Sequence, residues 1–512
     1  MSSSPPSQTY NYILRLRIWD LLIGIILWLG FLLRLNRLGE RSLWFDESIE
    51  YWMASAPINE IHIAVSTATH DPPFYSYLLH IWQRLGTGEF WMRTPSLFFS
   101  VLAIACVIRL SSQALGKRAG IVAGLLMAVS AADIRYAQEV GQYALMVFLV
   151  ALNLIFLYEA LTRHDWFLWM IWGITASIAI YTHYGSVIIV AATAFVVLIA
   201  QAVQRRWAIV WRQIMIGMIA IVSLIPLITY VIPRQLNRLG ATTQPIDLTQ
   251  FLTISRSIIQ FQFMGNQLGG WSWPTLPMAI VWVPAMVAIL FAIVNSKSII
   301  DWPILFIATW IVYYLVGTTG SYFFSGSRHS LLVTPIFYIV LGLGIVKLHD
   351  VWRIGSVIVF GLLMIISVFA PVEGQEDIRG STIYLLENRS PNDPIYVYYG
   401  AVPGFRYQLE QATNKVENVP ATWYLDCMGL EIQNYCHTDN IFYGRWFRSM
   451  SLDEKRASII SSLGFAPERF WIIFSHVHSQ EHLDIVEILS DEYQVIQKRN
   501  DGGETAMLLN KR

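Results

Sequence analysis

Apolar runs long enough to cross a lipid bilayer recur along this 512-residue chain as far as residue 371. A membrane-spanning helix needs about 20 mainly apolar residues, because every backbone polar group must find its partner inside the helix. We count about eleven such runs, which lie near residues 18–38, 95–111, 119–133, 141–161, 166–182, 185–203, 209–231, 276–294, 303–317, 330–346 and 354–370. The sequence therefore predicts an α-helical polytopic membrane protein with about eleven transmembrane helices.

Composition agrees with a membrane protein and excludes other classes. The chain is 55% hydrophobic and 14% charged, whereas a soluble domain carries about 25% charged residues. Its net charge of zero provides no basic field for nucleic acid, so we expect membrane lipids and no nucleic acid as partners. Three cysteines exclude a disulfide scaffold, and no Cys or His spacing suggests zinc. The first run lacks a small-residue cleavage site, and we interpret it as a retained anchor.

Basic residues predict the orientation, because short loops rich in Lys and Arg stay in the cytoplasm. With the N-terminus inside, the cytoplasmic loops contain Arg15, Arg17, Lys117, Arg118, Arg163, Arg205, Arg206, Arg212, Lys297, Lys347 and Arg353. Arg34, Arg37 and Arg41 break the rule at the outer end of the first span, where we expect them to serve a phosphate-handling cleft. We thus predict a multi-pass plasma (inner) membrane protein whose tail and active site are extracytoplasmic.

The chain after the last span changes character. It is polar, with strand-like runs at 394–399 and 470–474 and a helix-like run at 453–463. We therefore predict two domains, a multi-spanning domain at 1–371 and a small extracytoplasmic α/β domain at 372–512.

Two of the three cysteines, Cys427 and Cys436, lie in this tail. An oxidising exterior would allow them to form a disulfide. Two unrelated free thiols explain the same pair equally well.

The predicted first outer loop, residues 39–94, opens with the acidic pair Asp46 and Glu47 directly after the first span. Carboxylates are costly in hydrocarbon and cheap just outside it, so they indicate a water-filled cleft suited to acid–base work or cation binding. Residues 48–53 read as a short amphipathic helix whose aromatic side chains lie at headgroup level.

Further along the same loop, His70 and Asp71 precede a double proline that fixes a turn, and a second interfacial helix follows at 77–85. The plainer interpretation is that Asp46 caps a helix and that His70 and Asp71 only form the turn. We favour a functional site because several reactive groups gather in one loop.

Other candidate residues lie at predicted outer ends of spans. Spacings of three and four place four of them on one helix face, namely Arg135, Glu139, Gln142 and Tyr143. A solvated ion pair between Arg135 and Glu139 is the alternative. His183 lies at another outer helix end, and a small-residue turn brings Arg328 and His329 to the start of a span, an arrangement suited to phosphate.

Six motifs in a fixed order then carry a family resemblance. They are Leu-Trp-Phe-Asp-Glu at 43–47, His-Asp-Pro-Pro-Phe-Tyr at 70–75, Arg-Thr-Pro-Ser at 93–96, Arg-Tyr-Ala-Gln-Glu-Val-Gly-Gln-Tyr-Ala at 135–144, Thr-His-Tyr at 182–184 and Arg-His-Ser-Leu-Leu at 328–332. This order resembles the multi-spanning glycosyltransferases of the C-type fold, above all the branch of dolichyl-phosphate-mannose protein mannosyltransferases and aminoarabinose transferases.

The resemblance implies an enzyme that moves a sugar from a polyprenyl-phosphate carrier to a hydroxyl of a glycan, lipid or protein. It implies that Asp46, with Glu47 beside it, is the catalytic base or binds the acceptor, and that Glu139 is a second acidic position. Because Asp-x-Asp is absent from the first loop, the resemblance leaves open whether the enzyme uses a divalent metal ion. If one binds, Asp46 and Glu139 are its expected ligands.

Two other functions were weighed against this one. A transporter or flippase of lipid-linked sugars should have charges in the middle of its spans and two similar halves. Here the ionisable residues gather at span ends and no halves match. A sensor or scaffold that binds through its tail would not need acids, histidines and arginines in its loops. We therefore favour the transferase.

Overall fold

The computed structural model describes residues 6–69, 71–230, 246–265, 275–294, 301–369, 376, 378–413, 437–438, 440–444, 450–463, 467–477, 481–501 and 504–512. The chain forms two compact units. Unit 1 contains Met1–Asn36 and Arg93–Pro371, and unit 2 contains Arg37–Met92 and Val372–Arg512. In this division residues 37–92 belong with the tail, whereas the sequence placed them in the multi-spanning domain.

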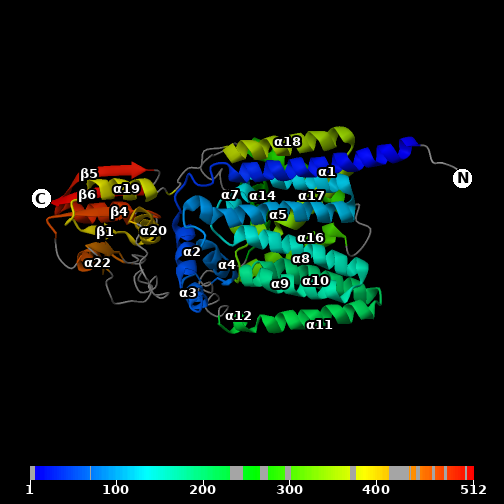
Figure 1. Cartoon of the computed structure of the whole chain (residues 1–512), viewed down its shortest axis with the longest axis horizontal. Helices are drawn as coiled ribbons and strands as arrows, with labels where there is room; N and C mark the ends of the chain where they lie inside the picture. Colours follow the sequence, from blue (N-terminus) through cyan, green and yellow to red (C-terminus); the bar gives the residue numbers. More distant parts are fainter. Residues whose placement is uncertain are drawn as a thin grey trace. The chain divides into compact units, whose positions relative to one another are not determined.

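Unit 1 is a bundle of helices that run side by side (Figure 1). They are α1 (Pro6–Leu35), α5 (Glu89–Leu115, whose first four residues belong to unit 2), α6 (Lys117–Ala128), α7 (Ala131–Ala137), α8 (Tyr143–Arg163), α9 (Trp166–Thr182), α10 (Ser186–Val203), α11 (Trp207–Ser223), α12 (Ile225–Tyr230), α14 (Leu248–Met264), α15 (Thr275–Val294), α16 (Trp302–Thr318), the 3₁₀ helix η2 (Arg328–Val333), α17 (Thr334–Lys347) and α18 (Asp350–Phe369). Within the described ranges, five helices are long and apolar enough to cross a membrane, or six if the bent pair α6–α7 is one span. Unit 1 is a multi-pass membrane bundle, and the count of about eleven spans stays a prediction.

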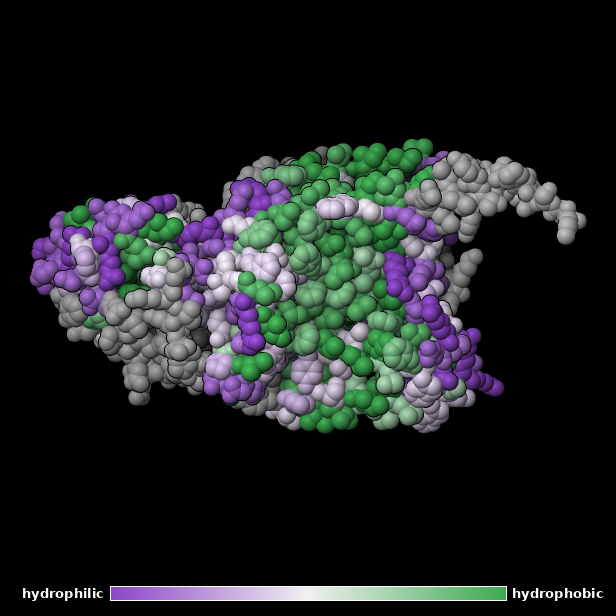
Figure 2. Space-filling view, in the orientation of Figure 1, coloured by the Kyte–Doolittle hydropathy of each residue, from purple (hydrophilic) through white to green (hydrophobic). Residues whose placement is uncertain are grey.

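The outside of unit 1 is apolar. Trp28, Ile219 and Leu362 are 64%, 63% and 56% exposed, and Figure 2 shows a broad hydrophobic surface over the helices, bordered by hydrophilic residues where α10 meets α11. Inside, small residues let helices approach closely. A Cβ on Gly344 would lie 1.9 Å from the backbone oxygen of Ala288, so only glycine fits between α17 and α15. This pattern is that of a bundle that packs by small residues and faces lipid.

The predicted span at 119–133 is broken in the structure. Helices α6 and α7 meet at a 60° bend. The buried guanidinium of Arg34 lies at this break and donates to the backbone oxygens of Ala128 at 2.8 Å and Met127 at 3.2 Å, the last carbonyls of α6. It also donates to the hydroxyl of Ser100 at 2.7 Å. The expectation that Arg34 serves phosphate was therefore wrong, because its donors satisfy a helix end inside unit 1.

Residues 232–275, which separate two predicted spans, contain the helix α14. Its last turn is tied to α7, where the hydroxyl of Ser130 donates to the backbone oxygen of Gln262 at 2.8 Å. The Gln262 carbonyl oxygen also accepts from the hydroxyl of Tyr338 at 2.6 Å. Local pattern missed α14 because its polar residues, Gln262 among them, find partners inside the bundle.

Unit 2 contains a six-stranded sheet in the order β2-β3-β1-β4-β6-β5. Its strands are β1 (Ile395–Val397), β2 (His437–Thr438), β3 (Ile441–Tyr443), β4 (Arg469–Phe474), β5 (Tyr493–Asp501) and β6 (Glu504–Lys511), and its helices are α2 (Phe45–Ser55), α3 (Ile61–Ala68), α4 (Phe74–Gln83), α19 (Ile378–Asn388), α20 (Val402–Thr413), α22 (Leu452–Leu463) and α23 (Glu481–Ser490), with the short η3 (Tyr399–Ala401). Strand β1 is parallel to β3 and β4, while β6 is antiparallel to β4 and β5. The runs predicted as strands and helix at 394–399, 470–474 and 453–463 fall on β1, β4 and α22. Cys427 and Cys436 lie outside the described residues.

Helix α2 packs against the tail. Ile49 and Met53 share one apolar core with strand residues such as Ile395. Tyr51 is only 2% exposed, and its hydroxyl donates to Glu410 of α20 at 2.9 Å. For Tyr51 the prediction of a headgroup position was therefore wrong, since α20 buries its ring and offers a carboxylate to its hydroxyl.

Candidate functional site

The two ends of unit 1 differ in chemistry. The α8–α9 turn and the start of α11 lie at one end, because Arg212 donates to the backbone oxygen of His164 at 2.5 Å. The far end of α11 meets the far end of α9, where the hydroxyl of Tyr181 donates to the backbone oxygen of Ser223 at 2.8 Å. Arg163 and Arg206 therefore share the first end, and His183, which follows α9, lies at the other.

An aromatic and cationic cluster occupies this second end. The rings of Tyr143 and His183 are 5.3 Å apart, and the Arg328 guanidinium carbon lies 5.7 Å from the centre of the Tyr143 ring. Tyr322, which no sequence motif indicated, is 5.9 Å from His183 and 5.6 Å from His329 by ring centres, and its hydroxyl donates to the His329 backbone oxygen at 3.0 Å. The structure thus brings together four predicted residues from three separate segments.

His183 is held as a neutral ring. The backbone N–H of Gly185 donates to its Nδ1 at 3.0 Å, which leaves the proton on Nε2. Burial, with smaller effects from His329 and Arg328, holds the pKa of His183 well below its ordinary value. A side chain on Gly185 would collide with the Tyr322 hydroxyl, 2.5 Å from where its Cβ would lie. His183 is therefore a hydrogen-bond donor near neutral pH and contributes no positive charge.

Arg135 lies in α7, whereas Glu139 and Gln142 lie between α7 and α8, so the prediction of one shared helix face was wrong because the helix ends at Ala137. Ser130 caps α7 by accepting the backbone N–H of Asp133 at 3.3 Å, which places Arg135 in the last turn. The Arg135 Nε is buried without a hydrogen-bond partner among the described residues, so it has a donor left for an anion. Glu139 and Gln142 are 7% and 5% exposed.

Asp46 and Glu47 occupy the first turn of α2 in unit 2. Glu47 is 1% exposed and accepts the backbone N–H of Trp44 at 3.2 Å. Glu47 therefore satisfies a backbone group at the helix end, the role that the plainer interpretation of the sequence gives to Asp46. Asp46 is only partly buried.

Glu50, which was not among the predicted site residues, lies one turn beyond Asp46. It accepts the hydroxyl of Ser76 at 3.2 Å. Burial raises the pKa of Glu50 to about 8, with further contributions from the charges of Asp71 and Asp46. Glu50 thus carries a proton near neutral pH, with the side chains of Asp71 and Asp46 close by. The spacing of four from Asp46 was the signal that could have found it. His70 lies outside the described residues.

The described residues contain no group of three or more His, Cys, Asp or Glu side chains arranged to hold a metal ion. Of the two expected ligands, Asp46 belongs to unit 2 and Glu139 to unit 1.

Comparisons with known proteins agree with this arrangement. Residues 70–230 match the family model of dolichyl-phosphate-mannose-protein mannosyltransferase. The structure of ArnT from Cupriavidus metallidurans in the apo state matches over 96% of this chain and 97% of that chain, with a TM-score of 0.55 and 13% identity. The chain has the C-type glycosyltransferase fold. The predicted resemblance is thereby confirmed.

Two further structures share this C-type fold. ArnT from Cupriavidus metallidurans bound to undecaprenyl phosphate matches with a TM-score of 0.51 and 13% identity, over 96% of this chain and 97% of that one. The Archaeoglobus fulgidus oligosaccharyltransferase in the apo form matches with a TM-score of 0.50 and 11% identity, over 96% of this chain and 74% of that one. No curated protein matches the sequence.

Proposed function

We propose that this chain is an integral-membrane glycosyltransferase that moves a sugar from a polyprenyl-phosphate carrier to an acceptor hydroxyl of a lipid, glycan or protein. The observation that carries the proposal is the C-type fold, which matches ArnT over 96% of this chain. One ArnT structure is bound to undecaprenyl phosphate. At one end of unit 1, this fold presents Arg328 and the Nε of Arg135, which has no hydrogen-bond partner among the described residues, and both arginines suit a phosphate.

The reaction needs little more than these groups. A glycosyl phosphate already has a good leaving group, so the enzyme must deprotonate the acceptor hydroxyl and stabilise the departing phosphate. Asp46 is the proposed base. Arg328 and Arg135 are the proposed phosphate ligands, with the ring of Tyr143 beside Arg328. The remaining proposed binding residues are His70, Asp71, Gln142, His183 and His329, and Glu139 is the proposed second acidic position.

We place the reaction at the extracytoplasmic face of the plasma (inner) membrane, together with the tail at 372–512. The basic residues Arg163, Arg206 and Arg212 support this side, since they lie at the end of unit 1 opposite to Arg328 and His183. A divalent metal at Asp46 or Glu139 stays a proposal that chelation during the assay would test.

Purified protein in nanodiscs, incubated with polyprenyl-phosphate sugars and a lipid or glycan extract, tests the activity. We expect free polyprenyl phosphate to accumulate together with a sugar-modified acceptor, both measured by mass spectrometry. A flippase would instead move the intact lipid-linked sugar across vesicles without breaking the bond between sugar and phosphate. Movement without cleavage would therefore contradict the transferase.

A further inference from the structure

The helix that carries Asp46 cannot cap its own N-terminus fully. The first backbone N–H groups of a helix have no partner within it. The residue before α2 is Trp44, whose side chain has no oxygen to accept them. Glu47 accepts the N–H of Trp44, which is only half of a capping box. Another group must therefore satisfy the next N–H, that of Phe45.

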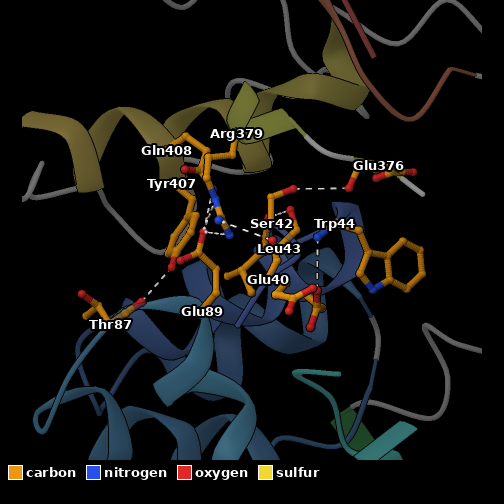
Figure 3. A network of polar contacts seen from close by, with 12 residues as sticks. Glu40, Ser42, Leu43, Trp44, Thr87, Glu89, Glu376, Arg379, Tyr407 and Gln408 are labelled. Carbon is orange, nitrogen blue, oxygen red and sulfur yellow. Dashed lines mark hydrogen bonds and ion pairs between the residues drawn. The ribbon is translucent and has the colours of Figure 1, made fainter. Parts of the chain in front are cut away.

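That group comes from the tail. The Oε2 of Glu376 accepts the backbone N–H of Phe45 at 3.0 Å, across 331 positions of sequence. Its other oxygen, Oε1, lies 2.6 Å from Nδ1 of His476. The His476 ring stacks on the Phe45 ring, with centres 4.2 Å apart and planes 5° apart. Figure 3 shows Glu376 beside Ser42, whose hydroxyl donates to the Glu376 backbone oxygen at 3.3 Å.

We propose that Glu376 and His476 are positioning residues that hold the first turn of α2 and thereby fix the direction of the Asp46 carboxylate. This inference rests on the proposed function, in which Asp46 is the base. Asp46 follows Phe45 directly, so any movement of the Phe45 backbone moves the Asp46 side chain. Small misplacements of a base reduce turnover strongly, because the reacting atoms must meet in a narrow range of geometry.

The tail is attached to residues 37–92 by further contacts besides those of Glu376 and His476. In Figure 3, Arg379 and Gln408 both reach Glu89, at 2.9 Å from Arg379 Nη2 and 3.1 Å from Gln408 Nε2. Farther along α2, Trp52 donates to the backbone oxygen of Pro403 at 3.0 Å. Loss of Glu376 should therefore loosen the first turn of α2 while the rest of unit 2 stays assembled.

The test compares Glu376→Ala with Glu410→Ala in the full-length protein. Glu410 is a matched control, because it also accepts a hydrogen bond from α2, at Tyr51, but more than a turn beyond Asp46. Glu376→Ala should lower kcat about tenfold, the effect of losing one charge-assisted hydrogen bond, and leave the donor KM within about twofold. Glu376→Gln keeps an oxygen acceptor and should recover part of kcat. His476→Phe keeps a ring against Phe45 and should resemble Glu376→Gln.

Hydrogen–deuterium exchange of the peptide over residues 44–48 reports on the same contact independently of enzymatic activity. Exchange should accelerate about tenfold in Glu376→Ala and stay at the wild-type rate in Glu410→Ala. Equal losses of kcat in the two alanine variants, or wild-type kcat and exchange in Glu376→Ala, would overturn the inference. Absence of transfer by the wild-type protein would instead overturn the proposed function, and faster exchange at 44–48 would still support the hold on α2.

Discussion

Asp46 and Glu47 are neighbours in sequence with different surroundings in the structure. Glu47 is buried and bonded to the Trp44 backbone, whereas Asp46 is partly exposed and close to Glu50. We expect Asp46→Asn to abolish transfer with folding and membrane insertion intact, since only the charge and the proton-accepting capacity are removed. Glu47→Gln keeps an oxygen for Trp44 and should retain most of the activity. Turnover assays on purified variants, with thermal unfolding as a folding control, measure both; near-normal turnover of folded Asp46→Asn would contradict the base assignment.

Glu50 gives unit 2 a pH dependence of known sign. Its pKa is raised from 4.5 to about 8 on folding, so the folded state binds more protons than the unfolded state between these values. Its protonation therefore supports folding fully below pH 4.5, and this support is lost as pH rises towards about 8. We expect the stability of the wild-type protein to fall over this range by more than about 1 kcal/mol relative to Glu50→Gln. Thermal unfolding of both proteins in detergent between pH 5 and 9 measures the difference, and parallel curves would remove Glu50 from this role.

Arg328 gives the most direct test of the proposal that arginines bind the donor phosphate. Arg328→Ala should weaken use of the polyprenyl-phosphate donor by about tenfold or more, since a charge-assisted hydrogen bond contributes roughly 1.5 to 3 kcal/mol. Arg328→Lys keeps the charge but loses the planar fork, and should retain part of the activity. Arg206→Ala, an exposed arginine at the opposite end of unit 1, is the control. Kinetics with varied donor measure the effect, and an unchanged apparent donor affinity in Arg328→Ala would leave this residue an ordinary interfacial one.

At the scale of elements, one side chain from α1, that of Arg34, donates to the backbone oxygens at the break between α6 and α7. Arg34→Met should destabilise unit 1 by about 2 kcal/mol or more, because the backbone oxygens of Met127 and Ala128 would lose their buried donors. Arg37→Met removes an exposed arginine paired with Glu40 and should change stability by less than about 1 kcal/mol. Thermal unfolding in detergent compares the two variants. Equal stabilities would mean that water replaces the guanidinium at the break.

Helices and strands were predictable from the sequence wherever one local pattern decided them. The apolar runs predicted at 141–161 and 185–203 became α8 (Tyr143–Arg163) and α10 (Ser186–Val203), because a bilayer leaves the backbone no other way to satisfy its polar groups. Helix α14 was not predicted, because Gln262 is a polar residue that a local pattern assigns to a loop. In the structure Gln262 is buried, and it hydrogen-bonds with Ser130, Tyr338 and Thr334.

At the scale of the whole molecule, the orientation of the chain in the membrane decides on which side the proposed reaction takes place. We expect the tail outside and the α8–α9 turn inside, because Arg163 and its basic neighbours favour the cytoplasm. In a variant whose three native cysteines are replaced by serine, Ser490→Cys should react with an impermeant maleimide in intact cells and Thr162→Cys should not. Both positions are exposed. The opposite labelling would overturn the orientation and the proposed side of catalysis together.

Local spacing of residues in the sequence determined most of the helices, two strands of the tail and the set of candidate residues, because each depends on neighbours within a few positions. The tertiary structure alone decided that residues 37–92 belong with the tail, through pairs such as Phe45 with Glu376 and Arg379 with Glu89. It also decided that Glu47 serves a helix end, that Arg34 caps a broken span and that Glu50 holds a proton. These roles depend on partners distant in sequence or on burial, and a carboxylate or guanidinium looks the same in a sequence whether water, a carbonyl or another charge surrounds it.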